Sequence, residues 1–208
     1  MEDILSLYEA PYAPARPVIC FDERPCQLIG EVLVPLPMKP GRPRRQDYEY
    51  ARHGTCCVLL AFEPRRCWRF VQVHAQRTAV DYAHFMQALV ATYYPTAERI
   101  CLVQDNLNTH TPGSFYAAFP PQEAFALAQR FELHYTPLKA SWLNMAEIEF
   151  SALAQQCLDR RIGDMDTLTH EAVMWATKRN QAHKTVRWKF TQSDARRKLA
   201  GKYPIIHN

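Results

Sequence analysis

The chain has 208 residues, of which 48% are hydrophobic and 22% charged, so it is long enough to bury a core without disulfides. It contains no apolar run of about 18 residues and no basic region before an apolar run at its start, which argues against a membrane span or a signal peptide. The seven cysteines form no CxxC pair and are expected to be reduced, as in a cytoplasmic protein. The net charge of +4 is unevenly distributed, because residues 177–208 hold nine Lys or Arg and one acidic residue.

Apolar, β-rich runs predict five strands, at residues 17–21, 55–62, 67–73, 100–103 and 132–135. Pro25 is expected to prevent the first strand from continuing as a central strand. Helical spacing predicts helices at residues 79–94, with Thr78 as N-cap, and at 121–130, 143–158, 166–179 and 193–200. Clustered prolines predict extended loops at residues 11–17, 35–43 and 112–121.

The order of these elements predicts an α/β fold. Short connections between the first three strands favour antiparallel pairing, whereas helices between the later strands imply parallel crossovers. We therefore expect a mixed five-stranded sheet flanked by helices, with a helical, basic C-terminal tail. The expected division is a lead segment at residues 1–16, a catalytic domain at 17–164 and a basic extension at 165–208 packed on that domain.

Two predicted strands end in an aspartate, Asp22 after the first and Asp105 after the fourth. If these strands are parallel neighbours, roughly 4.8 Å apart, the two carboxylates lie together and repel unless a cation sits between them. Mg²⁺ prefers such oxygen ligands. A third carboxylate is expected from the helix at 143–158, where Glu147 and Glu149 flank the apolar stripe on opposite sides, so periodicity does not choose between them.

Several motifs resemble the bacterial branch of the mariner-like superfamily of DDE transposases, in order from about residue 8 to residue 204. Two of them are specific, namely Asp-Asn-x-x-Thr-His and Ser-Trp-Leu-Asn-x-x-Glu. The matching segments are Cys20–Pro25, Arg42–Arg45 with Asp47–Tyr50, Gln104–His110, Tyr135–Pro137, Ser141–Glu147, Trp188–Phe190 and Asp194–Arg196.

The resemblance implies a ribonuclease H-like fold whose first and fourth strands are adjacent and parallel. It implies that Asp22, Asp105 and Glu147 hold two Mg²⁺ ions, for which Mn²⁺ can substitute, and that Glu149 lies beside the metal ligands or on the surface. The 41 residues between Asp105 and Glu147 exceed the common family spacing, and we place the excess in residues 112–121.

The implied activity is cleavage of DNA at transposon ends followed by strand transfer, by a nucleoid-associated bacterial enzyme acting as a homodimer. Members of the family carry N-terminal helix-turn-helix modules, and the first strand here begins near residue 17, so a separate helix-turn-helix partner chain is one expectation. The alternatives are a ribonuclease H-like nuclease without strand transfer and a catalytically inactive remnant that binds DNA or a partner.

Four polar residues are candidates to support the metal ligands or contact the substrate: Asn106, Asn108, His110 and Asn144. His110 either orients a phosphate or metal-bound water, or bonds a backbone carbonyl in a loop. Asn144 either positions Glu147 or contacts DNA, or else caps a helix. Glu23 points to the opposite face from Asp22 and is expected to be structural, and Trp142 is expected in the core.

Exposed basic residues are candidates for contacts to the DNA backbone, and the alternative is a solvated surface. They lie in a proline-rich basic arm around residues 39–52, at Lys139 and in the tail. The candidates are Arg42, Arg44, Arg45, Lys139, Lys184, Arg187, Lys189, Arg196 and Arg197, with Trp188 and Phe190 expected to anchor the tail.

Overall fold

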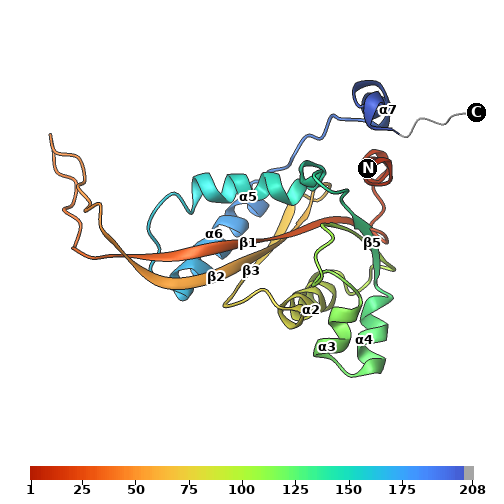
Figure 1. Cartoon of the computed structure of the whole chain (residues 1–208), viewed down its shortest axis with the longest axis horizontal. Helices are drawn as coiled ribbons and strands as arrows, with labels where there is room; N and C mark the ends of the chain where they lie inside the picture. Colours follow the sequence, from red (N-terminus) through yellow and green to blue (C-terminus); the bar gives the residue numbers. More distant parts are fainter. Residues whose placement is uncertain (204–208) are drawn as a thin grey trace, which may run out of the picture.

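The computed structural model describes residues 1–203 and contains a five-stranded mixed sheet (Figure 1). The strand order is β3-β2-β1-β4-β5, with β1, β2 and β3 antiparallel and with β4 and β5 parallel to β1. This confirms the predicted fold class and the parallel pairing of the first and fourth strands. The strands are β1 (Val18–Glu31), β2 (Tyr50–Glu63), β3 (Trp68–His74), β4 (Ile100–Gln104) and β5 (Phe131–Tyr135).

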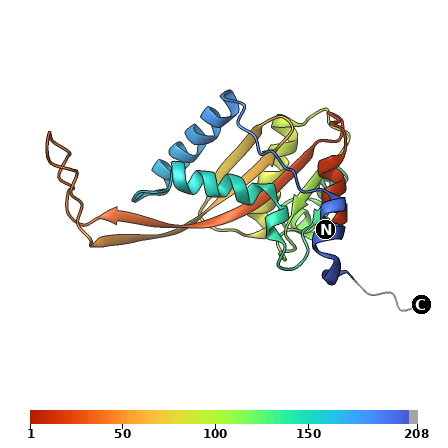
Figure 2. The same ribbon diagram turned by 90° about the horizontal axis from the view of Figure 1, so that it is seen from above.

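Helices cover both faces of this sheet (Figures 1 and 2). Thr78 caps α2 in a capping box with Asp81, as its position predicts. The α-helices are α1 (Glu2–Glu9), α2 (Ala79–Ala88), α3 (Gly113–Ala118), α4 (Pro121–Ala128), α5 (Met145–Gln156), α6 (Met165–Gln181) and α7 (Gln192–Lys198). A π-helical turn at Leu89–Tyr93 extends α2, and 3₁₀ turns lie at Ser141–Leu143 and Ala200–Lys202.

Two helices, α1 and α3, were not predicted from the sequence. The lead segment contains α1, which buries Ile4 and Leu5 fully. The segment 112–121, predicted as an extended loop, contains α3, and its prolines lie at helix starts: Pro112 and Pro120 are the N-cap residues of α3 and α4. Proline is tolerated there because the first N–H groups of a helix have no intrahelical acceptor.

Successive side chains of the central strands point to opposite faces of the sheet, which divides the core into two layers. Cys20, Val58 and Leu60 face a cluster that includes residues of α1, α5 and α6. Ile19 and Leu59 face the opposite cluster, with residues of α2, α3 and α4. The middle parts of β1 and β2 are therefore covered on both faces of the sheet, which explains why their sequences are continuous apolar runs.

The first strand is much longer than predicted, because β1 passes through Pro25 and ends at Glu31. The predicted end at residue 21 was wrong, whereas the expectation that the strand does not continue past Pro25 as a central strand holds. β4 pairs only with Val18–Cys20, so beyond Cys20 β1 pairs with β2 alone. On its other side, this part of β1 makes no ladder of hydrogen bonds that a proline would interrupt.

The long β1–β2 ribbon holds its connecting segment, residues 32–49, far from the body of the molecule (Figures 1 and 2). This segment is the arm, and it contains Lys39, Arg42, Arg44 and Arg45 of the predicted basic stretch at 39–52. The arm contains two isolated bridges, Leu36–Arg45 and Lys39–Arg42. Its base is held by Arg161, whose guanidinium lies 2.6 Å from the Glu31 carboxylate and also donates to the backbone carbonyls of Asp47 and Glu49. The arm is therefore attached at its base and exposed along its length.

The C-terminal residues return to the body at two places. The buried residues of α6, including Leu168 and Trp175, join the same core cluster as α5. Farther along, Trp188 packs edge-to-face on Tyr8 with ring centroids 5.2 Å apart, which confirms its anchoring role. The extension thus packs on the domain, while the boundary at residue 164 stays a prediction.

All seven cysteines are free. Within residues 1–203, no helix is long and apolar enough to cross a membrane.

The contact between α1 and α7 predicts a measurable pH response. Hydrogen bonds from Arg196 and Tyr203 lower the pKa of Glu2 from 4.5 to about 2. Because the folded-state pKa lies below the ordinary value, this contact contributes stability above pH 4.5 and is lost as the pH falls towards 2. An NMR titration of the Glu2 carboxyl carbon should give a midpoint near 2, and Arg196→Ala should raise it towards 4.5. Arg197→Ala is the control, because Arg197 pairs with Asp194. An unchanged midpoint in Arg196→Ala would contradict the assignment.

Candidate catalytic site

The sheet brings two of the predicted carboxylates to the same end of neighbouring strands. The parallel ladder pairs Cys20 of β1 with Val103 of β4, and Asp22 and Asp105 each follow two residues later. Both are only partly exposed. Side chains two positions apart point to the same face of a strand, so the register places Asp22 and Asp105 side by side, as predicted.

The electrostatics of Asp22 show that acidic groups gather around it. Burial raises the pKa of Asp22 to about 7, and the negative charge of Glu147 adds to this, as do Glu23 and Asp105. A hydrogen bond from the Glu23 N–H, 2.9 Å long, acts in the opposite direction. Without a cation, Asp22 would therefore be partly protonated at neutral pH.

The start of α5 positions Glu147. Asn144 is the N-cap of this helix and accepts a hydrogen bond from the Ala146 N–H at 3.1 Å. Its amide nitrogen donates to the Phe21 carbonyl at 2.8 Å and lies 3.4 Å from an Asp22 carboxylate oxygen. Asn144 is thus both a helix cap and a link between the first turn of α5, which carries Glu147, and β1.

Glu149 is separated from Glu147 by its environment. It is fully buried, and both of its oxygens lie 2.7 Å from guanidinium nitrogens of Arg69 and 3.0 Å from those of Arg179. Glu147 is exposed. Glu149 is therefore committed to a structural ion-pair network, and the suggestion of a surface position was wrong. This contrast distinguishes two residues that helical periodicity leaves equivalent.

His110 lies between two carboxylates. Its Nδ1 is 2.6 Å from Asp105 Oδ1, and its Nε2 is 2.9 Å from Glu23 Oε2. Burial lowers the pKa of His110, but the bonds to Asp105 and Glu23 outweigh it and raise the pKa to about 9. The backbone carbonyl of His110 accepts from Gln104 and Tyr135, both at 2.9 Å. The imidazolium thus orients Asp105, and the ring does not bond a backbone carbonyl as the second alternative proposed.

Glu23 and Arg77 complete this neighbourhood. The Glu23 side chain is 4% exposed and fixes His110, which agrees with the structural role predicted for it. Arg77, which the sequence reasoning missed, lies 3.8 Å from Glu23 and borders a shallow pocket of about 250 Å³ together with Asn106 and Asn108. Arg77 stands just before the helix cap Thr78 and belongs to no motif, so only the fold places it here.

The predicted DNA-binding residues are all exposed. They lie on the arm (Arg42, Arg44, Arg45), in the loop after β5 (Lys139) and along the tail (Lys184, Arg187, Lys189, Arg196, Arg197). Arg196 pairs with Glu2, and Arg44 lies 3.8 Å from Glu31. Trp142, expected in the core, is instead 45% exposed and stacks on Trp188 at 6.1 Å.

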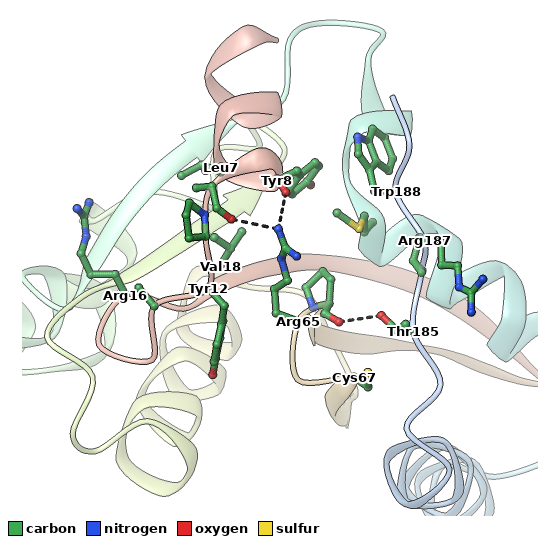
Figure 3. A pocket seen from close by; sticks show the side chains of 16 residues that line it. Leu7, Tyr8, Tyr12, Arg16, Val18, Arg65, Cys67, Thr185, Arg187 and Trp188 are labelled. Carbon is green, nitrogen blue, oxygen red and sulfur yellow. Dashed lines mark hydrogen bonds between the residues drawn. The ribbon is translucent and has the colours of Figure 1, made fainter. Parts of the chain in front are cut away.

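A pocket of about 420 Å³ lies away from the carboxylates (Figure 3). It is formed by residues 7–18, the turn between β2 and β3 and tail residues 185–188. Arg65 closes one wall by donating to the carbonyls of Tyr8 and Ala10, and Thr185 donates to the Pro64 carbonyl at 2.7 Å. Of the predicted site residues, only Arg187 borders it, so it is separate from the candidate catalytic site.

The three carboxylates are more widely spaced than the ligands of a single ion. In the part of the chain that the structure describes, one group of three metal-type side chains has ligand atoms all within 4.8 Å, namely Cys101, Glu132 and His134. Asp22, Asp105 and Glu147 are not such a group. Wider spacing is expected if the outer two serve different ions, because paired ions lie about 3.5–4 Å apart.

The strand order, the parallel β1–β4 pair and the acidic side chains at their ends are those expected of a ribonuclease H-like fold. A family match makes the assignment more specific. The family described as DDE superfamily endonuclease matches residues 17–169, and the chain belongs to this family. This confirms the resemblance indicated by the motifs.

Solved structures agree on the fold. The Mos1 mariner paired end complex with Mn matches with a TM-score of 0.58 and 14% identity, covering 88% of this chain and 55% of that one. The Mos1 strand transfer complex gives 0.58 and 13%, covering 85% and 51%. The Mos1 transposase catalytic domain with Raltegravir and Mn gives 0.56 and 12%, covering 85% and 77%. The chain therefore spans about half the length of the first two proteins. No curated protein sequence matches it.

Proposed function

We propose that this chain cleaves DNA at transposon ends and joins the freed ends to target DNA, with Asp22, Asp105 and Glu147 as metal ligands. The observation that carries the proposal is the gathering of acidic groups around Asp22, whose pKa is raised to about 7 by burial and by the negative charges of Glu147, Glu23 and Asp105. The chain belongs to a family of endonucleases, and a divalent cation bound between these carboxylates in the working enzyme would explain why they are held close together.

The donor set fits two Mg²⁺ ions, or Mn²⁺ in their place. All three proposed ligands offer carboxylate oxygens, which these ions prefer. Asp22 would bridge the two ions, while Asp105 and Glu147 would each hold one. When bound, such a pair lowers the pKa of a water nucleophile and stabilises the attacking and leaving oxygens of a phosphodiester.

The chain's own residues would prepare this site. His110 holds one Asp105 oxygen at 2.6 Å, which fixes the rotamer of that carboxylate. Asn144 ties Glu147's helix to β1 through the Phe21 carbonyl. Arg77, Asn106 and Asn108 border the adjacent pocket and are placed to contact a phosphate of the DNA strand. The exposed arm and tail would supply further backbone contacts.

We propose a homodimer as the active form, by analogy with the solved structure of a transposase described as a paired end complex. A helix-turn-helix partner chain would provide recognition of the transposon end, since the residues named here make non-specific contacts. We place the enzyme at the bacterial nucleoid, because its proposed substrate is chromosomal DNA.

The test uses the purified full chain with a supercoiled plasmid and a labelled oligonucleotide that carries a free 3′-hydroxyl. We expect Mg²⁺-dependent nicking of the plasmid and joining of the oligonucleotide to it, both abolished by EDTA. Nicking without joining would instead indicate a nuclease. DNA binding without either reaction, in Mg²⁺ and in Mn²⁺, would support the inactive remnant.

A further inference from the structure

A second cluster of metal-type side chains lies at the far end of β4 from the catalytic carboxylates. Cys101 of β4 and Glu132 and His134 of β5 offer a sulfur, a carboxylate oxygen and an imidazole nitrogen that all lie within 4.8 Å of one another. Cys101 precedes Asp105 by four residues, which corresponds to about 13 Å along a strand. The parallel ladder pairs Cys101 with Glu132 and Val103 with His134, so the strands themselves bring the three side chains together.

The imidazole of His134 is oriented like that of a metal ligand. Its Nδ1 lies 2.7 Å from a carboxylate oxygen of Asp3 in α1, so a neutral ring would keep its proton on Nδ1 and present the lone pair of Nε2 to an ion. Nε2 is fully buried and has no hydrogen-bond partner, although Glu132 Oε1 lies 3.3 Å away. His134 itself is only 9% exposed. A carboxylate behind a histidine whose second nitrogen is unpaired is the arrangement that supports zinc ligands.

The two oxygens of Glu132 are divided between different partners. Oε2 pairs with Arg16, and Oε1 faces His134. Figure 3 shows Arg16 at the edge of the 420 Å³ pocket, with its guanidinium turned away from Tyr12 and Arg65. Arg16 therefore fixes Glu132 without occupying the oxygen that faces the cluster. Glu132 is partly exposed, which leaves a route for an ion to reach the buried thiol of Cys101.

The donor types and the charge both select zinc. Thiolate, imidazole and carboxylate suit Zn²⁺, with bonds of about 2.3, 2.0 and 2.0 Å, whereas Mg²⁺ requires oxygen ligands. The negative charges of a Cys101 thiolate and the Glu132 carboxylate balance the two positive charges of the ion. The negative charge of Asp3 offsets the positive charge of Arg16 in the same cluster. Three protein ligands leave the fourth tetrahedral position for water.

We propose that Cys101, Glu132 and His134 bind one Zn²⁺ ion, which fastens α1 to β4 and β5 through Asp3. The site is separate from the DDE carboxylates and does not depend on the proposed transposase activity. It would join the N-terminal helix to the edge of the sheet through the contact between Asp3 and His134. The metal-free alternative is a protonated His134 held between Asp3 and Glu132.

The test measures zinc bound to the full chain carrying Asp22→Asn, Asp105→Asn and Glu147→Gln, so that the catalytic carboxylates do not contribute. After dialysis against ZnSO₄, metal analysis should give one Zn²⁺ per chain, and Co²⁺ in its place should show a thiolate charge-transfer band. Cys101→Ser should remove this band, whereas Cys157→Ser, which alters a buried cysteine at the end of α5, should not.

Asp3→Ala keeps the proposal testable if core variants fail to fold, because Asp3 is 63% exposed and supplies no ligand atom. It should weaken Zn²⁺ binding about 10–100-fold. Zinc should also raise the thermal midpoint of the parent chain, and this rise should be smaller in Asp3→Ala. Failure to retain zinc, a Co²⁺ spectrum without a thiolate band, or zinc affinity unchanged by both Cys101→Ser and Asp3→Ala would each overturn the proposal.

Discussion

Asp22→Asn is expected to reduce Mg²⁺-dependent DNA cleavage by at least about 10³-fold, equivalent to roughly 4 kcal/mol of barrier, since metal ions supply several kcal/mol of transition-state stabilisation. Asp22 has the largest effect because it is proposed to bridge both ions. The same change removes a carboxyl group that burial and Glu147 disfavour as an anion, so the folded state should not lose stability. Plasmid nicking and thermal unfolding, measured on the same preparation, check both statements.

Two matched controls separate the loss of a ligand from the loss of a negative charge. Asp159→Asn removes an exposed carboxylate far along the chain and should leave the nicking rate unchanged. Glu147→Gln should lose activity while staying folded, whereas Glu149→Gln should lose stability and keep its activity per folded molecule. Retained nicking in Glu147→Gln, together with loss in folded Glu149→Gln, would overturn the choice of glutamate.

Arg69→Met is expected to destabilise the fold by about 3–5 kcal/mol, because it leaves a fully buried carboxylate without its main partner. The Arg69 and Glu149 side chains are both 0% exposed. Arg69 also donates to the carbonyls of Cys67 and Lys184 and lies over the ring of Phe62, with its guanidinium carbon 4.6 Å from the centroid. It thus links β3, α5 and the start of the tail.

Urea unfolding of the wild type, Arg69→Met and the double variant Arg69→Met/Glu149→Leu measures this effect. The double variant should be less destabilised than the single one, because removing both charges leaves no uncompensated carboxylate. A single-variant loss under about 1 kcal/mol would show that Arg179 alone is enough to satisfy Glu149. The arginine replaced here belongs to no transposase motif, so this result also tests an assignment made only from the structure.

The sequence predicts the strand order well because each strand contains a short apolar run bounded by polar residues, although β1 and β2 extend well beyond those runs. Where it fails, a tertiary contact overrides a local rule. Pro25 is tolerated inside β1 because β4 is too short to pair with that part of the strand. Pro112 begins a helix because its missing N–H costs nothing at a helix start.

The candidate site is only partly predictable. Asp22 and Asp105 follow from strand ends, but helical periodicity leaves Glu147 and Glu149 equivalent, and in the structure the ion pairs of Glu149 with Arg69 and Arg179 distinguish them. His110 is visible in a motif, yet its contact with Glu23 depends on how β1 and the loop after β4 meet in space. The large apolar side chain of Trp142 favours a core position, but the structure shows that it is covered by Trp188 of the tail, a contact that the sequence does not reveal.

Diffraction from crystals of the wild-type chain soaked in Mn²⁺ tests most directly whether the three carboxylates hold metal. Anomalous difference maps should show two peaks about 3.5–4 Å apart, one touching Asp22 and Asp105 and the other touching Asp22 and Glu147. Peaks bound elsewhere, with these three side chains ordered and free of metal, would contradict the account.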